Sequence, residues 1–170
     1  LRKRDRLGLE GRAGGAPMVN LVTRNIVTPS GTAGHITELL NKSERGVIVA
    51  GPVSDPGAVG PALCRLATAT GFPLLADPLS GARYGQHFNA HVVAAHDLIL
   101  RDDEVRAALR PDLIVRVGSS PTSSSLMAFV EEAADVPQVV VAEGGRWNDH
   151  LWTASEHIRT APAPFLDSVT

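Results

Sequence analysis

The apolar positions of this chain fall into two alternating patterns. Runs rich in β-branched residues over 46–51, 113–117 and 137–142 have the length and composition of buried strands, and 73–77 and 156–159 are shorter candidates. Between them, apolar residues recur at helical spacing over 32–41, 56–70 and 122–134, with a broken helix between 96 and 109. This alternation predicts a doubly wound α/β fold: a mainly parallel sheet of about five or six strands with helices on both faces.

The turn that follows the predicted strand 113–117 is the best placed for a binding site. Gly118 ends the strand, and Ser119, Ser120 and Thr122 supply turn and N-cap residues for the next helix. Parallel sheets bind ligands outside the carboxyl ends of their strands, where helix N–H groups point outward. We therefore expect a site at this turn, although the turn contains no phosphate-binding motif.

The two ends of the chain have the composition of linkers. Residues 1–29 combine a basic opening with several glycines and an extended lead-in, and 163–170 lie beside Pro162 and include Pro164. We expect one α/β domain over 30–162, with a linker before it and an exit linker after it. Because the chain also begins without methionine, we expect it to be a piece of a larger polypeptide.

Composition narrows the classes of function. The chain has 170 residues, a net charge of −2 and 44% hydrophobic residues, as expected of one water-soluble domain with a sizeable core. This charge gives no reason to expect a nucleic-acid partner, and no apolar run approaches the ~20 residues of a membrane span. The single cysteine, Cys64, excludes an internal disulfide and favours the cytoplasm; it lies in an apolar helical pattern typical of a core residue.

Motifs for nucleotide and metal chemistry are incomplete. After the first predicted strand the sequence reads Gly51-Pro-Val-Ser-Asp-Pro-Gly57, and Pro52 removes an N–H group that a pyrophosphate cradle would use. His87 and His91 would share one face of a helix and suit zinc, but the residues between them lack the glutamate of a zinc hydrolase. We expect a loop there rather than a metal site.

Serines and aspartates near the predicted strand ends allow two interpretations. The serines could supply a nucleophile, but none lies in a Gly-x-Ser-x-Gly motif, so turn formation and capping explain them better. The aspartates could act as acid–base groups, and they are equally well placed to cap helices or form turns. The residues concerned are Ser119, Ser120, Ser123, Ser124, Ser125, Asp55, Asp77 and Asp97.

Three arginines occupy positions that need a partner, and two of them are candidates for an anion site. Arg116 lies inside a predicted strand, so it needs a carboxylate partner or a position near the sheet edge. Arg83 and Arg146 follow predicted strands and could together bind an anionic ligand. A surface position stacked on Tyr84 or Trp147 is the favoured alternative for these two.

Several loops, in the right order, together resemble one enzyme family. They are Gly51-Pro52, 73–83, 96–101, 110–118, 121–126 and 144–149. The set resembles the central domain of 2-succinyl-5-enolpyruvyl-6-hydroxy-3-cyclohexene-1-carboxylate synthase over about 46–162. This resemblance implies part of a transferase of menaquinone biosynthesis, which decarboxylates 2-oxoglutarate and adds the succinyl unit to isochorismate with thiamine diphosphate and magnesium.

The resemblance also implies a separate role for each domain. In this family thiamine diphosphate lies between the first and third domains of different subunits, so the central domain supplies scaffold, subunit contacts and part of the substrate cleft. We expect no catalytic residue, metal or bound cofactor here, inactivity of the isolated chain, and flanking thiamine-binding domains in a homo-oligomer as partners. Family members often carry a lysine where this chain has Ser124, followed by Ser125. Candidate substrate- or anion-binding residues are therefore Arg83, Ser124, Ser125 and Arg146.

Two alternatives to a synthase fragment remain. The same sheet could form a self-standing module that binds or senses an anionic metabolite. It could also be the FAD- or ADP-binding central domain of another thiamine diphosphate enzyme, although no convincing nucleotide cradle is present. The linker-like ends favour the synthase fragment.

Overall fold

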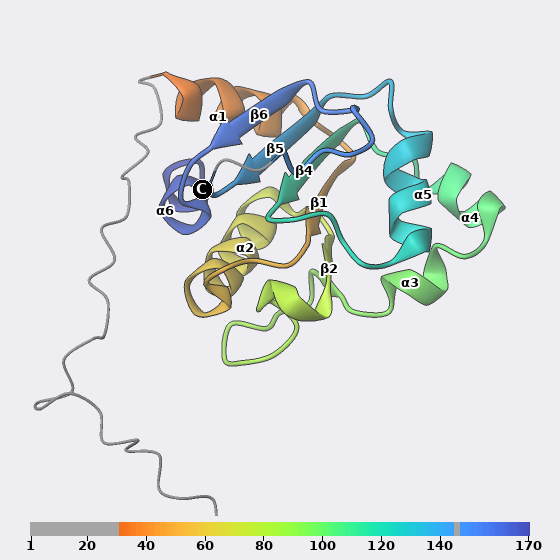
Figure 1. Ribbon diagram of the computed structural model, residues 1–170, viewed down its shortest axis with the longest axis horizontal. Coiled ribbons are helices and arrows are strands. Elements are labelled where there is room, and N and C mark those ends of the chain that lie inside the picture. The colour runs from red at the N-terminus through yellow and green to blue at the C-terminus, as the bar shows by residue number, and fades with distance from the viewer. Residues whose placement is uncertain (1–30, 145–146) are drawn as a thin grey trace, which may run out of the picture.

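The computed structural model describes residues 31–144 and 147–170. Six strands in this part of the chain form one parallel sheet in the order β3-β2-β1-β4-β5-β6 (Figure 1). The strands are β1 (Gly46–Ala50), β2 (Leu74–Ala76), β3 (Val92–Val93), β4 (Leu113–Val117), β5 (Gln138–Ala142) and β6 (Glu156–Arg159). The chain winds outward in opposite directions from the boundary between β1 and β4, which confirms the predicted doubly wound fold.

Helices cover both faces of the sheet. One face carries α1 (Thr32–Lys42), α2 (Pro56–Thr70) and α6 (Pro162–Ser168), whose apolar side chains join those of the strands in the larger core. The other face carries α3 (His96–Ile99) and α5 (Ser124–Glu132), with α4 (Asp103–Ala108) beside them (Figure 1). Every residue of β1, β4 and β5 is buried, because parallel strands inside such a sheet are covered on both sides.

Local signals in the sequence set the ends of the longest helix. The carboxylate of Asp55 accepts a hydrogen bond from the Ala58 N–H group at 3.1 Å, and Pro56 occupies the first helical position. Gly71 ends α2 with φ of 75°, a left-handed conformation that glycine adopts without steric penalty. The predicted bounds of this helix therefore agree with the structure.

The structure corrects the predicted exit linker over 163–170. Most of these residues belong to α6, in which Phe165 and Leu166 are buried against the core. Prolines in the first turn are compatible with a helix, because the first N–H groups have no partner within it. An ion pair between Arg65 and Asp167, at 2.7 Å, joins α2 to α6. The predicted linker over 1–29 lies outside the described residues.

Candidate functional site

The turns after β1 and β4 meet at the switch point of the sheet, where doubly wound folds bind their ligands. The N–H group of Gly51 donates to the carbonyl oxygen of Val117 at 2.9 Å, and that of Ser119 donates to Pro52 at 2.9 Å. A Cβ atom on Gly51 would lie 1.7 Å from the Ser119 carbonyl oxygen. Backbone of the turn after β4 therefore packs directly against Gly51 and leaves no room for a side chain there.

Asp77 joins the turn after β2 to the turn after β4. One carboxylate oxygen accepts from the Leu79 N–H group at 2.9 Å, and the other accepts from the N–H and hydroxyl groups of Thr122 at 3.0 and 2.7 Å. Burial acts to raise the pKa of Asp77, which is 1% exposed, but these hydrogen bonds outweigh it and the pKa is lowered. Asp77 is thus an ionised structural link that caps the short 3-10 helix η2 (Pro78–Ser80).

Asp97 makes a second link to the same turn. The Ser123 hydroxyl donates to its carboxylate at 2.6 Å, and Arg101 pairs with it at 3.0 Å. The hydrogen bond from Ser123, aided by Arg101, lowers the pKa of Asp97. The Ser123 oxygen in turn accepts from the Leu126 N–H group at 3.1 Å, so Ser123 is the N-cap of α5. The sequence predicted a helix cap in this turn, but at neighbouring residues.

Three of the four candidate ligand-binding residues lie in the described part of the chain. Ser124 is exposed and Ser125 half-buried, and both lie in the first turn of α5. Arg83 is half-buried and donates from its guanidinium to the Ala94 carbonyl oxygen at 2.9 Å. Within the described residues, no hydrogen bond or ion pair joins Arg83 to either serine. Arg146 lies outside the described residues.

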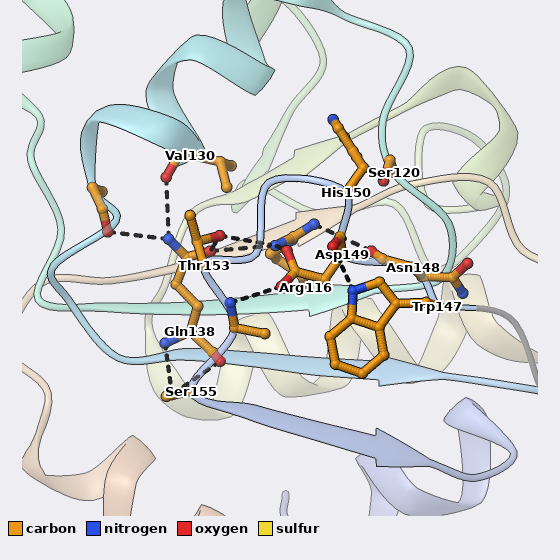
Figure 2. Close-up of polar contacts among 12 residues, drawn as sticks. Arg116, Ser120, Val130, Gln138, Trp147, Asn148, Asp149, His150, Thr153 and Ser155 are labelled. Atoms are coloured by element: carbon orange, nitrogen blue, oxygen red, sulfur yellow. Dashed lines mark hydrogen bonds and ion pairs between the residues drawn. The ribbon is translucent and has the colours of Figure 1, made fainter.

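Arg116 forms a buried ion pair behind this edge of the sheet (Figure 2). Its guanidinium lies 2.7 Å from the Asp149 carboxylate, and the two side chains are 4% and 1% exposed. It also donates to the Asn148 carbonyl oxygen at 3.2 Å and the Thr153 hydroxyl at 3.3 Å. The ion pair confirms the expected carboxylate partner. The sheet-edge alternative is wrong, because β4 lies inside the sheet.

The ion pair positions the loop between β5 and β6. Burial acts to raise the pKa of Asp149, but hydrogen bonds from the Ala154 N–H group, at 2.9 Å, and from Arg116 lower it. Gln138 completes the network: its amide donates to the carbonyl oxygens of Val130 and Ala133 near the end of α5, both at 3.1 Å. The loop, β4, β5 and α5 are therefore held by one set of buried polar contacts.

Two further groupings in this loop were not predicted. The His150 ring nitrogen Nδ1 lies 2.8 Å from the Ser120 hydroxyl, thirty positions away in the chain (Figure 2). Trp147 stacks on His157, with ring centroids 4.9 Å apart, and its other neighbour is Trp152 at 5.5 Å. Neither ring nitrogen of His157 has a hydrogen-bond partner among the described residues, and burial lowers the pKa of this histidine. Only the folding of β5 and β6 beside β4 brings these residues together.

Metal-binding groups are absent from the described part of the chain. No three His, Cys, Asp or Glu side chains there are grouped so that they could hold a metal ion. The ring of His87 instead contacts the Gly81 carbonyl oxygen at 2.8 Å, and that of His96 contacts the Val93 carbonyl oxygen at 2.9 Å. None of the helices between 31 and 170 is long and apolar enough to span a membrane.

The sheet order defines a doubly wound α/β domain, and hydrogen bonds join the turns after β1, β2 and β4 at its carboxyl edge. Comparison with known proteins gives the family. Residues 31–160 match the model described as the middle domain of thiamine pyrophosphate enzymes, and the chain belongs to this family.

The chain is also similar to curated proteins named 2-succinyl-5-enolpyruvyl-6-hydroxy-3-cyclohexene-1-carboxylate synthase. It is 37% identical to the protein of Bacillus velezensis over 135 residues, 39% to that of Haloarcula marismortui over 141, and 37% to that of Halobacterium salinarum over 160. These alignments cover 79%, 81% and 92% of this chain but 23%, 24% and 26% of the relatives. The chain thus spans about a quarter of the length of these relatives.

A solved structure supports the fold. The X-ray structure assigned to a thiamin diphosphate-dependent enzyme from Mycobacterium smegmatis superimposes with a TM-score of 0.55 at 17% identity. The match covers 92% of this chain and 30% of that one. At this identity the likeness concerns the fold alone.

Proposed function

We propose that this chain is the central domain of a 2-succinyl-5-enolpyruvyl-6-hydroxy-3-cyclohexene-1-carboxylate synthase. Such an enzyme decarboxylates 2-oxoglutarate and adds the succinyl unit to isochorismate in menaquinone biosynthesis. The observation that carries the proposal is the similarity to relatives of this name across 79–92% of the chain in the three alignments above. Flanking thiamine-binding domains of the same polypeptide, in a cytoplasmic homo-oligomer, are the partners that the proposal requires.

The role proposed for this domain is that of a scaffold beside the substrate cleft. Asp77 and Asp97 both hold the turn after β4, and Arg116 holds the loop after β5 through Asp149. Ser54 and Glu143 add a contact of 2.6 Å between the turns after β1 and β5. We assign thiamine diphosphate and Mg²⁺ to parts of the synthase outside residues 1–170, and accordingly expect the isolated domain to be inactive.

The candidate anion site is a finer part of the same proposal. The exposed hydroxyl of Ser124 stands at the N-terminal end of α5, where N–H groups favour negative charge. Ser125 lies in the same helical turn, and Arg83 forms no ion pair within the described residues. With Arg146, they would contact a carboxylate of the substrate or of a regulatory product of the pathway, by hydroxyl and guanidinium groups.

An assay of the complete polypeptide tests the function. It should convert 2-oxoglutarate and isochorismate only with thiamine diphosphate and Mg²⁺ present, and residues 1–170 alone should not. A complete polypeptide without this activity would contradict the proposal. Binding of chorismate-derived acids by a chain that is naturally this length would favour the metabolite-binding module, and retained flavin absorbance would favour the FAD-binding alternative.

The anion site needs its own variants. Ser124→Ala and Arg83→Gln in the complete enzyme should raise the KM for one carboxylate substrate while kcat changes little, because these groups would bind rather than react. Arg65→Gln is the matched control, since that arginine pairs with Asp167 on the covered face away from the turn. Unchanged KM in both variants would remove Arg83 and Ser124 from the site.

A further inference from the structure

The ring of His157, on strand β6, is shielded from solvent without a hydrogen-bond partner. Within the described residues, neither ring nitrogen contacts a donor or an acceptor. A neutral imidazole carries one N–H donor and one acceptor, so both are left unsatisfied, which is rare for buried polar groups. Leaving such groups unpaired costs free energy, and a conformation that returns the ring to water recovers this cost.

Trp147 covers one side of this ring. The two rings stack with their centroids 4.9 Å and their planes 15° apart, and Trp152 lies against Trp147 at 5.5 Å. The neighbour of His157, Ile158, is packed in the core beside α1, α2 and α6, so His157 points to the opposite face of the sheet. The described chain between β5 and β6 contains no helix, and Trp147 covers His157 in place of one.

The two tryptophans are held only weakly over the ring. Trp152 has a positive φ of 56°, a conformation that costs free energy for a bulky residue, and it is 79% exposed. Trp147 is 47% exposed, and its indole N–H donates to the Asp149 carbonyl oxygen at 2.6 Å (Figure 2). Half of the Trp147 surface is therefore still in water, and release of the loop would relieve the strain at Trp152.

The charged groups that face His157 disfavour an imidazolium in this position. Burial is the main cause that lowers the pKa of His157, and Arg159, on the same face of β6, and Arg116, from β4, lower it further. Asp149, from the loop, acts to raise this pKa. Its carboxylate, however, is already paired with Arg116 at 2.7 Å.

The remaining carboxylate near His157 is engaged elsewhere. Glu156 precedes His157 on β6 and points to the other face of the sheet, where it lies 2.6 Å from His35 of α1. Neither Glu156 nor Asp149 is therefore free to accept a hydrogen bond from a protonated His157 ring while Trp147 stays in place.

We propose that the stack of Trp147 on His157 is a pH-sensitive switch, closed while the imidazole is neutral and open when it is protonated. An imidazolium has two N–H donors, and the closed stack offers an acceptor to neither of them within the described residues. Protonation therefore requires the ring to reach water, and Trp147 must leave it for this to happen. The switch belongs to the domain itself and does not depend on the proposed function.

The opening is confined to the aromatic residues of the loop. The Asp149 carboxylate is held by Arg116 at 2.7 Å and by the Ala154 N–H group at 2.9 Å, and neither contact involves the His157 ring. Trp147 and Trp152 move into solvent while this anchor stays in place. Acid thus exposes an aromatic surface beside the edge strand β6 without unfolding the sheet.

NMR spectroscopy of residues 1–170 tests the switch, because the chain contains only two tryptophans and six histidines. The nuclear Overhauser contact between the Trp147 and His157 rings is followed from about pH 8 to about pH 5, with the chemical shifts of the His157 ring and the Ala154 amide. The ring should titrate below about pH 6.5, because burial lowers its pKa. One pH unit below that pKa, the contact should be about ten-fold weaker, with the Ala154 resonance unchanged.

Two variants serve as controls. His157→Phe keeps an aromatic ring for Trp147 without a group that titrates, so the contact should be equally strong at both ends of the pH range. His150→Gln removes the other histidine of the loop and should leave the transition in place. Loss of the transition in His150→Gln would overturn the inference.

The parent chain decides the question by itself if a variant fails to fold. A contact between Trp147 and His157 that persists while the His157 ring titrates would overturn the inference. So would a His157 ring that titrates only together with loss of the Ala154 resonance and those of the central strands, because the event would then be global unfolding.

Discussion

The buried ion pair between Arg116 and Asp149 predicts a large and specific loss of stability. In the variant Asp149→Ala, the guanidinium of Arg116 stays buried without its carboxylate, and the Ala154 N–H group loses its acceptor. Leaving a buried charge unpaired costs about 3–5 kcal/mol. For a domain of this size, each kcal/mol lowers Tm by roughly 2–4 °C, so Tm should fall by roughly 10 °C.

The assay is urea unfolding of residues 1–170, followed by circular dichroism, with thermal unfolding beside it. Asp135→Asn is the control, because Asp135 pairs with Arg110 at the surface and its side chain is 71% exposed. We expect that change to alter the free energy of unfolding by less than about 1 kcal/mol. The m-value should stay constant if only native-state stability changes.

A double variant separates the ion pair from the fold around it. Replacing both partners, Arg116→Met with Asp149→Leu, removes the uncompensated charge and should recover much of the loss, because buried pairs are often replaced by apolar residues at little net cost. The reasoning would be refuted if Asp149→Ala changed stability no more than Asp135→Asn. It would also be refuted if the double variant lost more free energy of unfolding than the two single variants lose together.

Three other substitutions test separate parts of the fold by the same unfolding assay. Gly51→Ala should lower the free energy of unfolding by about 1–3 kcal/mol, because the new Cβ would meet backbone of the turn after β4. The control Gly34→Ala places its Cβ in open space on α1 and should not destabilise the domain. Equal effects of the two changes would contradict the contact at Gly51. Ser123→Ala should lower the free energy of unfolding by about 1 kcal/mol, because α5 loses its N-cap. A similar loss for Ser124→Ala, at an exposed position, would argue against Ser123 as the cap. Burial lowers the pKa of His157, so its stabilising contribution is present above about pH 6.5 and is lost as pH falls through the folded pKa. His157→Phe should therefore lose less stability than the parent between pH 7 and pH 5; identical pH dependence would rule this out.

Elements with local signals could be predicted from the sequence alone. The β-branched runs of β1, β4 and β5 needed only their own composition to be recognised as buried strands. The bounds of α2 followed from Asp55, Pro56 and Gly71, which act on the backbone within a few positions of themselves. The resemblance to the synthase family likewise depended on short loops read in order.

The elements that were missed lack a local signal of their own. β3 contains two residues and exists because Val92 and Val93 pair with β2. α6 carries prolines typical of a linker, and its helix is stabilised by burial of Phe165 and Leu166 against the core. In both cases contacts with distant parts of the chain outweigh the composition of the segment.

The pairing of polar groups depends on the tertiary structure. The sequence showed that Arg116 needed a partner, but its choice of Asp149, thirty-three positions away, follows from the return of the chain between β5 and β6. The same return brings His150 to Ser120, whereas no hydrogen bond or ion pair within the described residues joins Arg83 to Ser124. The chemistry of a side chain is a property of its own residue. A charge that loses its water on burial needs a partner, and the path of the whole chain determines which partner lies within reach.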